Sequence, residues 1–219
     1  MPEKWLVHYG PLSFWAKLSP FKHTGIFPEQ SVHWDWMMKR IENANRPISV
    51  LNLFAYTGLA SLAAASAGAA VTHVDASRSA ITWANENQEA SQLKDKPIRW
   101  ILDDVLKFVS REIRRGNKYD AIIMDPPIFG HGADGETWKF HDNFPELLHH
   151  CRQLLSEKPL FILINAYAIS ASGIMLGNVL TDMTAGLNGT ITVGELALKQ
   201  MKNSRLLSTG IFSRWETQL

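Results

Sequence analysis

The chain has 219 residues, of which 46% are hydrophobic and 20% are charged, and its formal net charge is +1. This length fits one domain of generous size, and the composition excludes the disordered and fibrous classes of protein. A protein that holds nucleic acid by charge alone is usually far more basic. Any nucleic-acid contact here must therefore come from a local patch, from base-specific contacts or from another domain.

Cysteine occurs once, at Cys151, which excludes a disulfide within the chain and a thiolate metal cluster. The N-terminus lacks the charged and then apolar layout of a signal peptide, and no apolar run approaches the ~20 residues that cross a bilayer. We therefore expect a cytoplasmic protein without a membrane segment. His149 and His150 have no further ligand at a useful spacing, so we expect them on a helix surface, with no metal site.

The first 30 residues contain two short aromatic-rich segments separated by Gly10-Pro11, which predicts a β-hairpin. A helix is predicted from about residue 31 to the stretch before Pro47. Strand and helix patterns then alternate: strands are expected at 48–54, 70–74, 98–102, 119–124 and 160–164, and helices at 58–68, 77–91, 105–115 and 143–156. This alternation predicts a parallel sheet with helices on both faces.

The last third departs from strict alternation. A helix is expected at 172–184, followed by two strands at 190–198 and 206–215 that a polar turn joins. Such an ending predicts an antiparallel pair on a parallel sheet, whereas a dinucleotide dehydrogenase more often continues with another crossover. The three-glycine dinucleotide fingerprint is also missing after the first strand of the main sheet.

Glycine, carboxylates and prolines stand at the ends of four successive expected strands. They are Gly58, Asp75, Asp103 with Asp104, and Asp125-Pro126-Pro127. Ligands of open α/β sheets bind at this edge, where the strand order reverses. A carboxylate after the second strand can accept hydrogen bonds from both hydroxyls of a ribose, and one after the third can meet an adenine amine. Each residue alone also fits a turn or a helix cap, but their joint occurrence indicates a ligand site.

Four segments resemble motifs of the bacterial 23S ribosomal RNA methyltransferases, a group that includes cytosine-C5 enzymes and a related guanine-N7 domain. They are 51–58, 74–77, 103–105 and 124–129, and segment 23–30 resembles the group's loop that closes over S-adenosylmethionine (SAM). The resemblance runs from about residue 5 to the end. It implies an α/β, Rossmann-like class I methyltransferase fold: a mostly parallel seven-stranded sheet with an antiparallel terminal hairpin, preceded by a short N-terminal β-hairpin. Residues 1–30 would form this first hairpin and the cofactor-covering loop, and residues 31–219 the methyltransferase domain.

The same resemblance implies SAM as the cofactor and assigns roles to single positions. The implied cofactor-binding residues are Phe54, Tyr56, Thr57 and Gly58 at the methionine end, Asp75 and Ser77 at the ribose, Asp103 or Asp104 at the adenine amine, and Thr24, Phe27 and Gln30 in the covering loop.

The nucleophile determines the remaining chemistry. A planar nitrogen needs acceptors that hold the base and take up positive charge, and the Asp125 carboxylate and Pro126 carbonyl, fixed by two prolines with Pro127, suit this role. Carbon-5 of cytosine instead needs a thiolate. The cytosine-C5 relatives are expected to carry their cysteine just after the fifth strand, where this chain has Asn165 and no cysteine. We interpret Cys151 as a buried structural thiol, and we expect methylation of a base nitrogen in ribosomal RNA, with guanine favoured.

Three further residues are candidates for substrate contacts. Phe129 can stack on an extruded base or serve as a core residue, and Lys202 and Arg205 can contact phosphates or form a solvated hairpin tip.

Two alternative functions stay open. One is a methyltransferase acting on a small molecule or a protein, which the near-neutral charge supports. The other is a SAM-binding interaction module without catalysis.

Overall fold

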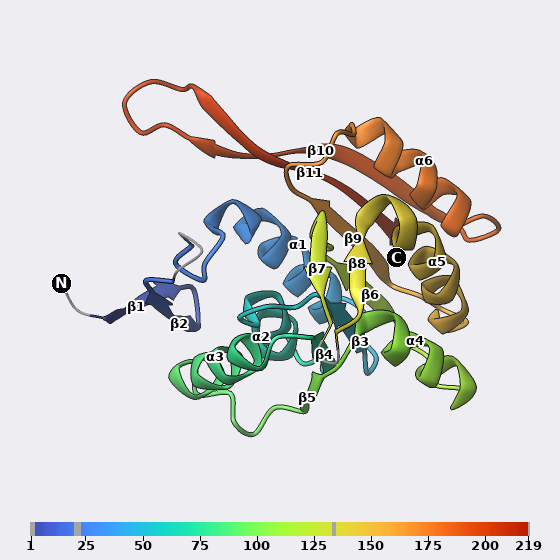
Figure 1. Ribbon diagram of the computed structural model, residues 1–219, viewed down its shortest axis with the longest axis horizontal. Helices are drawn as coiled ribbons and strands as arrows, with labels where there is room; N and C mark the ends of the chain where they lie inside the picture. Colours follow the sequence, from blue (N-terminus) through green and yellow to red (C-terminus); the bar gives the residue numbers. More distant parts are fainter. Residues whose placement is uncertain (1–2, 20–22, 133–134, 219) are drawn as a thin grey trace.

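The computed structural model describes residues 3–19, 23–132 and 135–218 (Figure 1). Its N-terminal hairpin consists of β1 (Lys4–Tyr9) and β2 (Leu12–Lys17), which pair antiparallel as expected. The helices that follow are η1 (Pro28–Gln30), α1 (Ser31–Glu42), α2 (Leu59–Ser66), α3 (Arg78–Ala90), α4 (Val105–Arg114), α5 (Phe140–Leu154) and α6 (Gly173–Met183). The strands are β3 (Ser49–Leu53), β4 (Ala70–Asp75), β5 (Ile98–Leu102), β6 (Ala121–Met124), β7 (Phe129–His131), β8 (Thr137–Lys139), β9 (Phe161–Ala166), β10 (Gly189–Lys199) and β11 (Leu206–Thr217).

The central sheet has seven strands in the order β10-β11-β9-β6-β3-β4-β5. Five of them, from β9 to β5, run parallel, and β11 is antiparallel to both β9 and β10. The expected Rossmann-like methyltransferase fold with an antiparallel terminal pair is therefore confirmed. The chain passes from β3 outward to β4 and β5 and then crosses to β6, so the strand order reverses between β3 and β6. This is the position at which open α/β sheets bind ligands.

Two layers of helices cover the sheet, one on each face (Figure 1). One core cluster joins α1, α2 and β2 to the sheet through residues such as Met37, Leu62 and Val50. The other joins α4, α5 and α6 to the opposite face through Phe108, Leu147 and Ile122. Buried strands with apolar residues on both faces are the expected signature of a parallel sheet.

The structure differs from the sequence expectations mainly between β6 and α5. Residues 129–131 and 137–139 form the short antiparallel pair β7 and β8, which the sequence pattern did not predict. Helix α5 begins at Phe140 rather than at residue 143, with Pro145 inside it. A proline in the second turn of a helix removes one backbone hydrogen-bond donor.

Candidate active site

A cavity of about 880 Å³ opens at the carboxyl ends of β3, β4 and β6. Its wall combines the loops after these strands with the loop before α1 and the β7–β8 pair. The charged side chains among its described lining residues are the carboxylates Asp75, Asp104 and Asp125, and that lining contains no lysine or arginine. The cavity thus offers a negative environment, which favours a ligand with a positive centre.

The loop after β3 has an unusual backbone. Phe54 and Tyr56 have φ angles of 56° and 48°, in the left-handed region that costs non-glycine residues roughly 1–3 kcal/mol each. Gly58 follows with φ 85°, and a Cβ atom there would lie 2.9 Å from Cβ of Ala84. Glycine is therefore required at this position for both conformation and space, although Gly58 itself does not line the cavity.

Asp75 at the end of β4 fixes this loop. Its Oδ2 accepts a hydrogen bond from the backbone N–H of Tyr56 at 2.8 Å, and its Oδ1 accepts one from the N–H of Ser77 at 2.8 Å. Burial raises the pKa of the Asp75 carboxyl, while these two donors act in the opposite direction. Each oxygen retains lone-pair capacity toward the cavity, so the carboxylate can also receive two ligand hydroxyls. Ser77 lines the cavity and caps α3 by accepting from the N–H of Ala80 at 3.3 Å.

The structure separates the two carboxylates after β5. Asp104 borders the cavity, and its Oδ1 caps α4 by accepting from the N–H of Lys107 at 3.0 Å. Asp103 is not among the lining residues and forms an ion pair with Arg111. Asp104 is thus the better placed of the two for an adenine amine.

The loop before α1 closes one side of the cavity with Phe27 and Gln30. It is tied to the β3 loop by the Thr57 hydroxyl, which donates to the carbonyl of Gly25 at 2.6 Å. Gly25 lies so close to Trp83 that a Cβ atom would come within 2.2 Å of the indole. Thr24, by contrast, is exposed, does not line the cavity, and accepts from the N–H of Lys17 through its carbonyl at 3.1 Å.

Asp125, at the end of β6, is held by a residue from the covering loop. The Gln30 amide donates to Asp125 Oδ2 at 2.8 Å and to the Tyr167 hydroxyl at 3.0 Å. Burial raises the pKa of Asp125 to about 6; the Gln30 hydrogen bond opposes this shift and the charge of Glu29 adds to it. Burial, with Asp125 and Glu29 nearby, also raises the pKa of Tyr167. The Asp125 carboxyl and the Tyr167 phenol therefore line the cavity in an environment that disfavours the charged form of each group.

Asn165, two residues before Tyr167, lines the same wall. Its side chain is 1% exposed, and its Oδ1 has no hydrogen-bond partner within the described residues. A buried acceptor without a partner is costly unless a ligand or water satisfies it. This side chain is therefore available to a bound molecule.

Sequence reasoning missed two residues of the site. Tyr167 follows β9, and its place after a strand end was the one available signal. Trp138 on β8 packs against Phe54 with ring centroids 4.7 Å apart and donates its indole N–H to the carbonyl of Pro127 at 2.7 Å. The Asp125-Pro126-Pro127 turn is thus supported by an aromatic residue from a strand that is three residues long.

The candidate substrate residues lie in different places. Phe129 is 54% exposed on the rim of the cavity, which excludes the interpretation as a core residue. Lys202 and Arg205 lie on the turn between β10 and β11, on the ribbon that projects beyond the sheet (Figure 1). We call residues 197–208 of this ribbon the arm. Neither basic residue lines the cavity.

Cys151 is buried within α5, and burial raises the pKa of its thiol. It belongs to the core beneath α4, α5 and α6 and does not line the cavity. A buried, protonated thiol is not a nucleophile. The interpretation of Cys151 as structural agrees with this placement.

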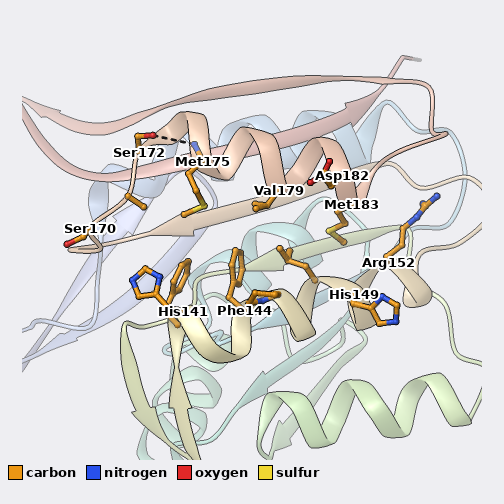
Figure 2. Close-up of a pocket in the computed structure, with 14 residues that line it drawn as sticks. His141, Phe144, His149, Arg152, Ser170, Ser172, Met175, Val179, Asp182 and Met183 are labelled. Carbon is orange, nitrogen blue, oxygen red and sulfur yellow. Dashed lines mark hydrogen bonds between the residues drawn. The ribbon is translucent and has the colours of Figure 1, made fainter.

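A second cavity, of about 670 Å³, lies between α5 and α6 (Figure 2). Figure 2 shows Phe144, Met175, Val179 and Met183 along it, with His141 and Arg152 toward its ends. Its lining includes none of the residues that the sequence analysis assigned to the cofactor, to catalysis or to the substrate. The chemistry therefore concentrates in the first cavity.

Comparisons with known proteins agree with this geometry. A family model described as S-adenosylmethionine-dependent methyltransferase matches residues 2–180. The solved structure of a SAM-dependent methyltransferase from Agrobacterium tumefaciens is 46% identical, with a TM-score of 0.96 over 100% of this chain and 71% of that one. Among curated proteins, "Ribosomal RNA large subunit methyltransferase K/L" of Syntrophotalea carbinolica is 35% identical over 62% of this chain and 18% of its own length. The same-named protein of Hahella chejuensis is 33% identical over 65% of this chain and 19% of its own. The chain therefore spans about a fifth of these two curated relatives.

Within the described residues, no helix is long and apolar enough to cross a membrane. The same residues contain no group of three or more histidine, cysteine, aspartate or glutamate side chains that could hold a metal ion.

Proposed function

Because the chain belongs to the family of SAM-dependent methyltransferases, we propose that it transfers a methyl group from SAM to a nitrogen atom of a base in ribosomal RNA, with guanine favoured. The observation that carries the choice of a nitrogen is the placement of Asp125. Its carboxylate stands at the end of β6, held by Gln30, in a cavity that no thiol lines.

The residues of the cavity fit SAM. Asp75 presents a carboxylate for the ribose, Asp104 one for the adenine amine, and the loop 54–58 passes close to the ligand space through its left-handed backbone. The three lining carboxylates suit a cationic sulfonium, and the volume is within the usual range for a cofactor pocket. When bound, SAM supplies an electrophilic methyl group, so alignment of the nucleophile supplies most of the barrier reduction.

The protein's part in this reaction is to hold the base and accept charge. Asp125 Oδ2 is occupied by Gln30, which leaves Oδ1 for a base N–H. The Pro126 carbonyl and the unpartnered Asn165 Oδ1 supply further acceptors on the same wall. Phe129 on the rim can stack on a base that has left its helix. Acceptors of this kind stabilise the positive charge that develops on a nitrogen nucleophile.

Ribosomal RNA as the substrate is supported by the relatives named above. Lys202 and Arg205 would contact phosphates away from the base through the exposed arm. An rRNA substrate also implies action in the cytoplasm. Since the match covers about a fifth of the length of these curated relatives, part of their RNA recognition can reside outside the matched region.

The test is methyl transfer from labelled SAM to total RNA that lacks modifications, followed by mass analysis of the nucleosides. We expect label in a methylated guanosine, and Asp75→Asn should strongly lower the transfer at limiting SAM concentration. Label in 5-methylcytidine would overturn the nitrogen assignment. Labelling of protein or small molecules, with none in RNA, would overturn the choice of substrate.

A further inference from the structure

Strand β10 forms one edge of the central sheet, and its outer side has no neighbouring strand among the described residues. The pairing of β11 with β9 covers only Ile211–Glu216, so the arm extends beyond the sheet as a two-stranded ribbon (Figure 1). Open strand edges of this length are normally covered or blunted, because they present unpaired N–H and C=O groups to other chains.

The arm and its base also expose apolar side chains. Val193, Leu198, Met201, Leu206 and Leu207 are all exposed, and Met201 is fully so. They make up nearly half of the large hydrophobic residues exposed in the described part of the chain. Clustered exposed apolar residues favour a protein partner over a nucleic acid.

The charges of β10 indicate which protein. The strand contains two charged residues, Glu195 and Lys199, and both are exposed. Neither has an ion-pair partner among the described residues. Ala197 lies midway between them. If two β10 strands pair antiparallel about a twofold axis at Ala197, Glu195 of each copy lies opposite Lys199 of the other.

We propose that the outer edge of β10 is a self-association surface through which two copies of this chain form a twofold dimer with a continuous sheet. Antiparallel edge pairing is isologous, so one complementary ion pair occurs twice. Within the arm, the outer edge of β11 is also open, but this strand is less regular. Leu196 of β10 pairs with Gly210 and Ala197 pairs with Ser208, so Thr209 of β11 has no residue opposite it. A bulge of this kind disrupts regular pairing.

The first measurement is the mass of the intact chain by sedimentation or light scattering at about 1 to 100 µM, the range in which weak dimers are detected. We expect a concentration-dependent dimer. Glu195→Lys places like charges opposite each other at two symmetric positions, and we expect it to weaken the dimer by about tenfold or more. The double variant Glu195→Lys with Lys199→Glu restores both pairs and should restore the dimer. A monomer at all concentrations, or a double variant no better than the single one, overturns the proposal.

A disulfide test distinguishes the two edges of the arm. Directly opposed residues of an antiparallel pair have Cα atoms about 4.5–5.5 Å apart, within the range of a disulfide. Ala197→Cys should therefore cross-link two copies under oxidising conditions, while Ser208→Cys, on the neighbouring strand, should not. The native Cys151 is buried and will not interfere. Cross-linking through Ser208→Cys alone overturns the β10 register. A monomeric chain whose RNA binding weakens in Lys199→Glu would assign the arm to RNA instead.

Discussion

Phe54 and Tyr56 hold a left-handed backbone only because their surroundings enforce it. The N–H of Ala55 donates to the carbonyl of Val74 at 3.1 Å, and the N–H of Tyr56 donates to Asp75. Phe54 is further packed against Trp138. Strain of this type persists at sites where a ligand needs the backbone in one shape. The loop after β3 is thus pre-organised by β4, its neighbour in the sheet.

Asp75→Asn tests this single residue. The amide NH₂ would face the N–H of Tyr56 or Ser77, so one hydrogen bond becomes a donor–donor clash. We expect SAM affinity, measured by calorimetry, to fall by about 50-fold or more, and the free energy of unfolding to fall by about 1–3 kcal/mol. Asp95→Asn, in an exposed turn, is the matched control and should change neither. Unchanged SAM affinity in Asp75→Asn would remove Asp75 from the cofactor site.

Asp125 makes stability depend on pH. Its pKa is about 6 in the folded protein, raised by burial from an ordinary value of 3.8, so the folded state binds the proton more tightly than the unfolded state. The free energy of unfolding of the ligand-free protein therefore falls as pH rises from about 4 to about 6, and the loss persists above that pH. Asp125→Asn removes the charge and should be more stable than the parent at pH 8 by about 2 kcal/mol, with no such gain below pH 4.

Urea unfolding of both proteins at several pH values measures this difference. Methyl transfer by the parent should decline as pH falls through about 6, since the proton occupies the acceptor. The Asn variant should lose activity at all pH values. A variant that is equally active, or no more stable at pH 8, would contradict the role of a buried carboxylate.

At the scale of elements, side chains along one face of α3 and its C-terminal end form hydrogen bonds with the backbone of β2, as a neighbouring strand would. The Trp83 indole donates to the carbonyl of Trp15 at 2.7 Å, and Asn87 Oδ1 accepts from the N–H of Trp15 at 2.8 Å. One turn on, the Ser91 hydroxyl bonds both the N–H and the carbonyl of Ser13, at 3.0 and 2.8 Å. Residues four apart share a helix face, so three side chains satisfy the backbone edge of the hairpin.

Asn87 also connects this hairpin to the cofactor loop, because its amide donates to the carbonyl of Thr57 at 2.9 Å. We expect Asn87→Ala to lower the free energy of unfolding by about 2 kcal/mol and to raise KM for SAM by about tenfold with a smaller effect on kcat. Asn85→Ala is the control, since among the described residues the Asn85 side chain bonds within its own helix, to the carbonyl of Ile81. Equal effects of the two substitutions on KM would show that Asn87 has no positioning role.

The elements that the sequence predicted are those with a clear apolar pattern. The five parallel strands and the terminal pair appear close to their expected bounds. Strands β7 and β8 have three residues each, too few for any periodicity to appear. Trp138 was missed for that reason. Its importance arises from packing against Phe54, a residue distant in the sequence.

At the scale of the whole molecule, the sheet topology assembles the site from distant segments. Gln30 lies 95 residues from Asp125 and 137 residues from Tyr167, yet it bonds both side chains. The sequence predicted Gln30 and Asp125 separately, because each stands in a recognisable motif. It could not predict their hydrogen bond, which depends on how η1 and the end of β6 meet at the edge of the parallel strands. Long-range partners follow from the fold and leave no local pattern.

Since the cavity wall draws on the N-terminal loop, both helical layers, the central sheet and the β7–β8 pair, a bound ligand should stabilise the molecule as one unit. S-adenosylhomocysteine, the demethylated product of SAM, should at 100 times its Kd add about 2.7 kcal/mol to the free energy of unfolding. For a domain of this size, that corresponds to a rise in Tm of roughly 5–10 °C in a single transition, measured by scanning calorimetry. NAD should give no shift, and Asp75→Asn should reduce the shift given by S-adenosylhomocysteine at the same concentration to about a quarter or less. If instead the transition split in two, with only one part raised, the covering loop and hairpin would unfold independently of the sheet, and the bonds from Thr57 and Asn87 would not couple them.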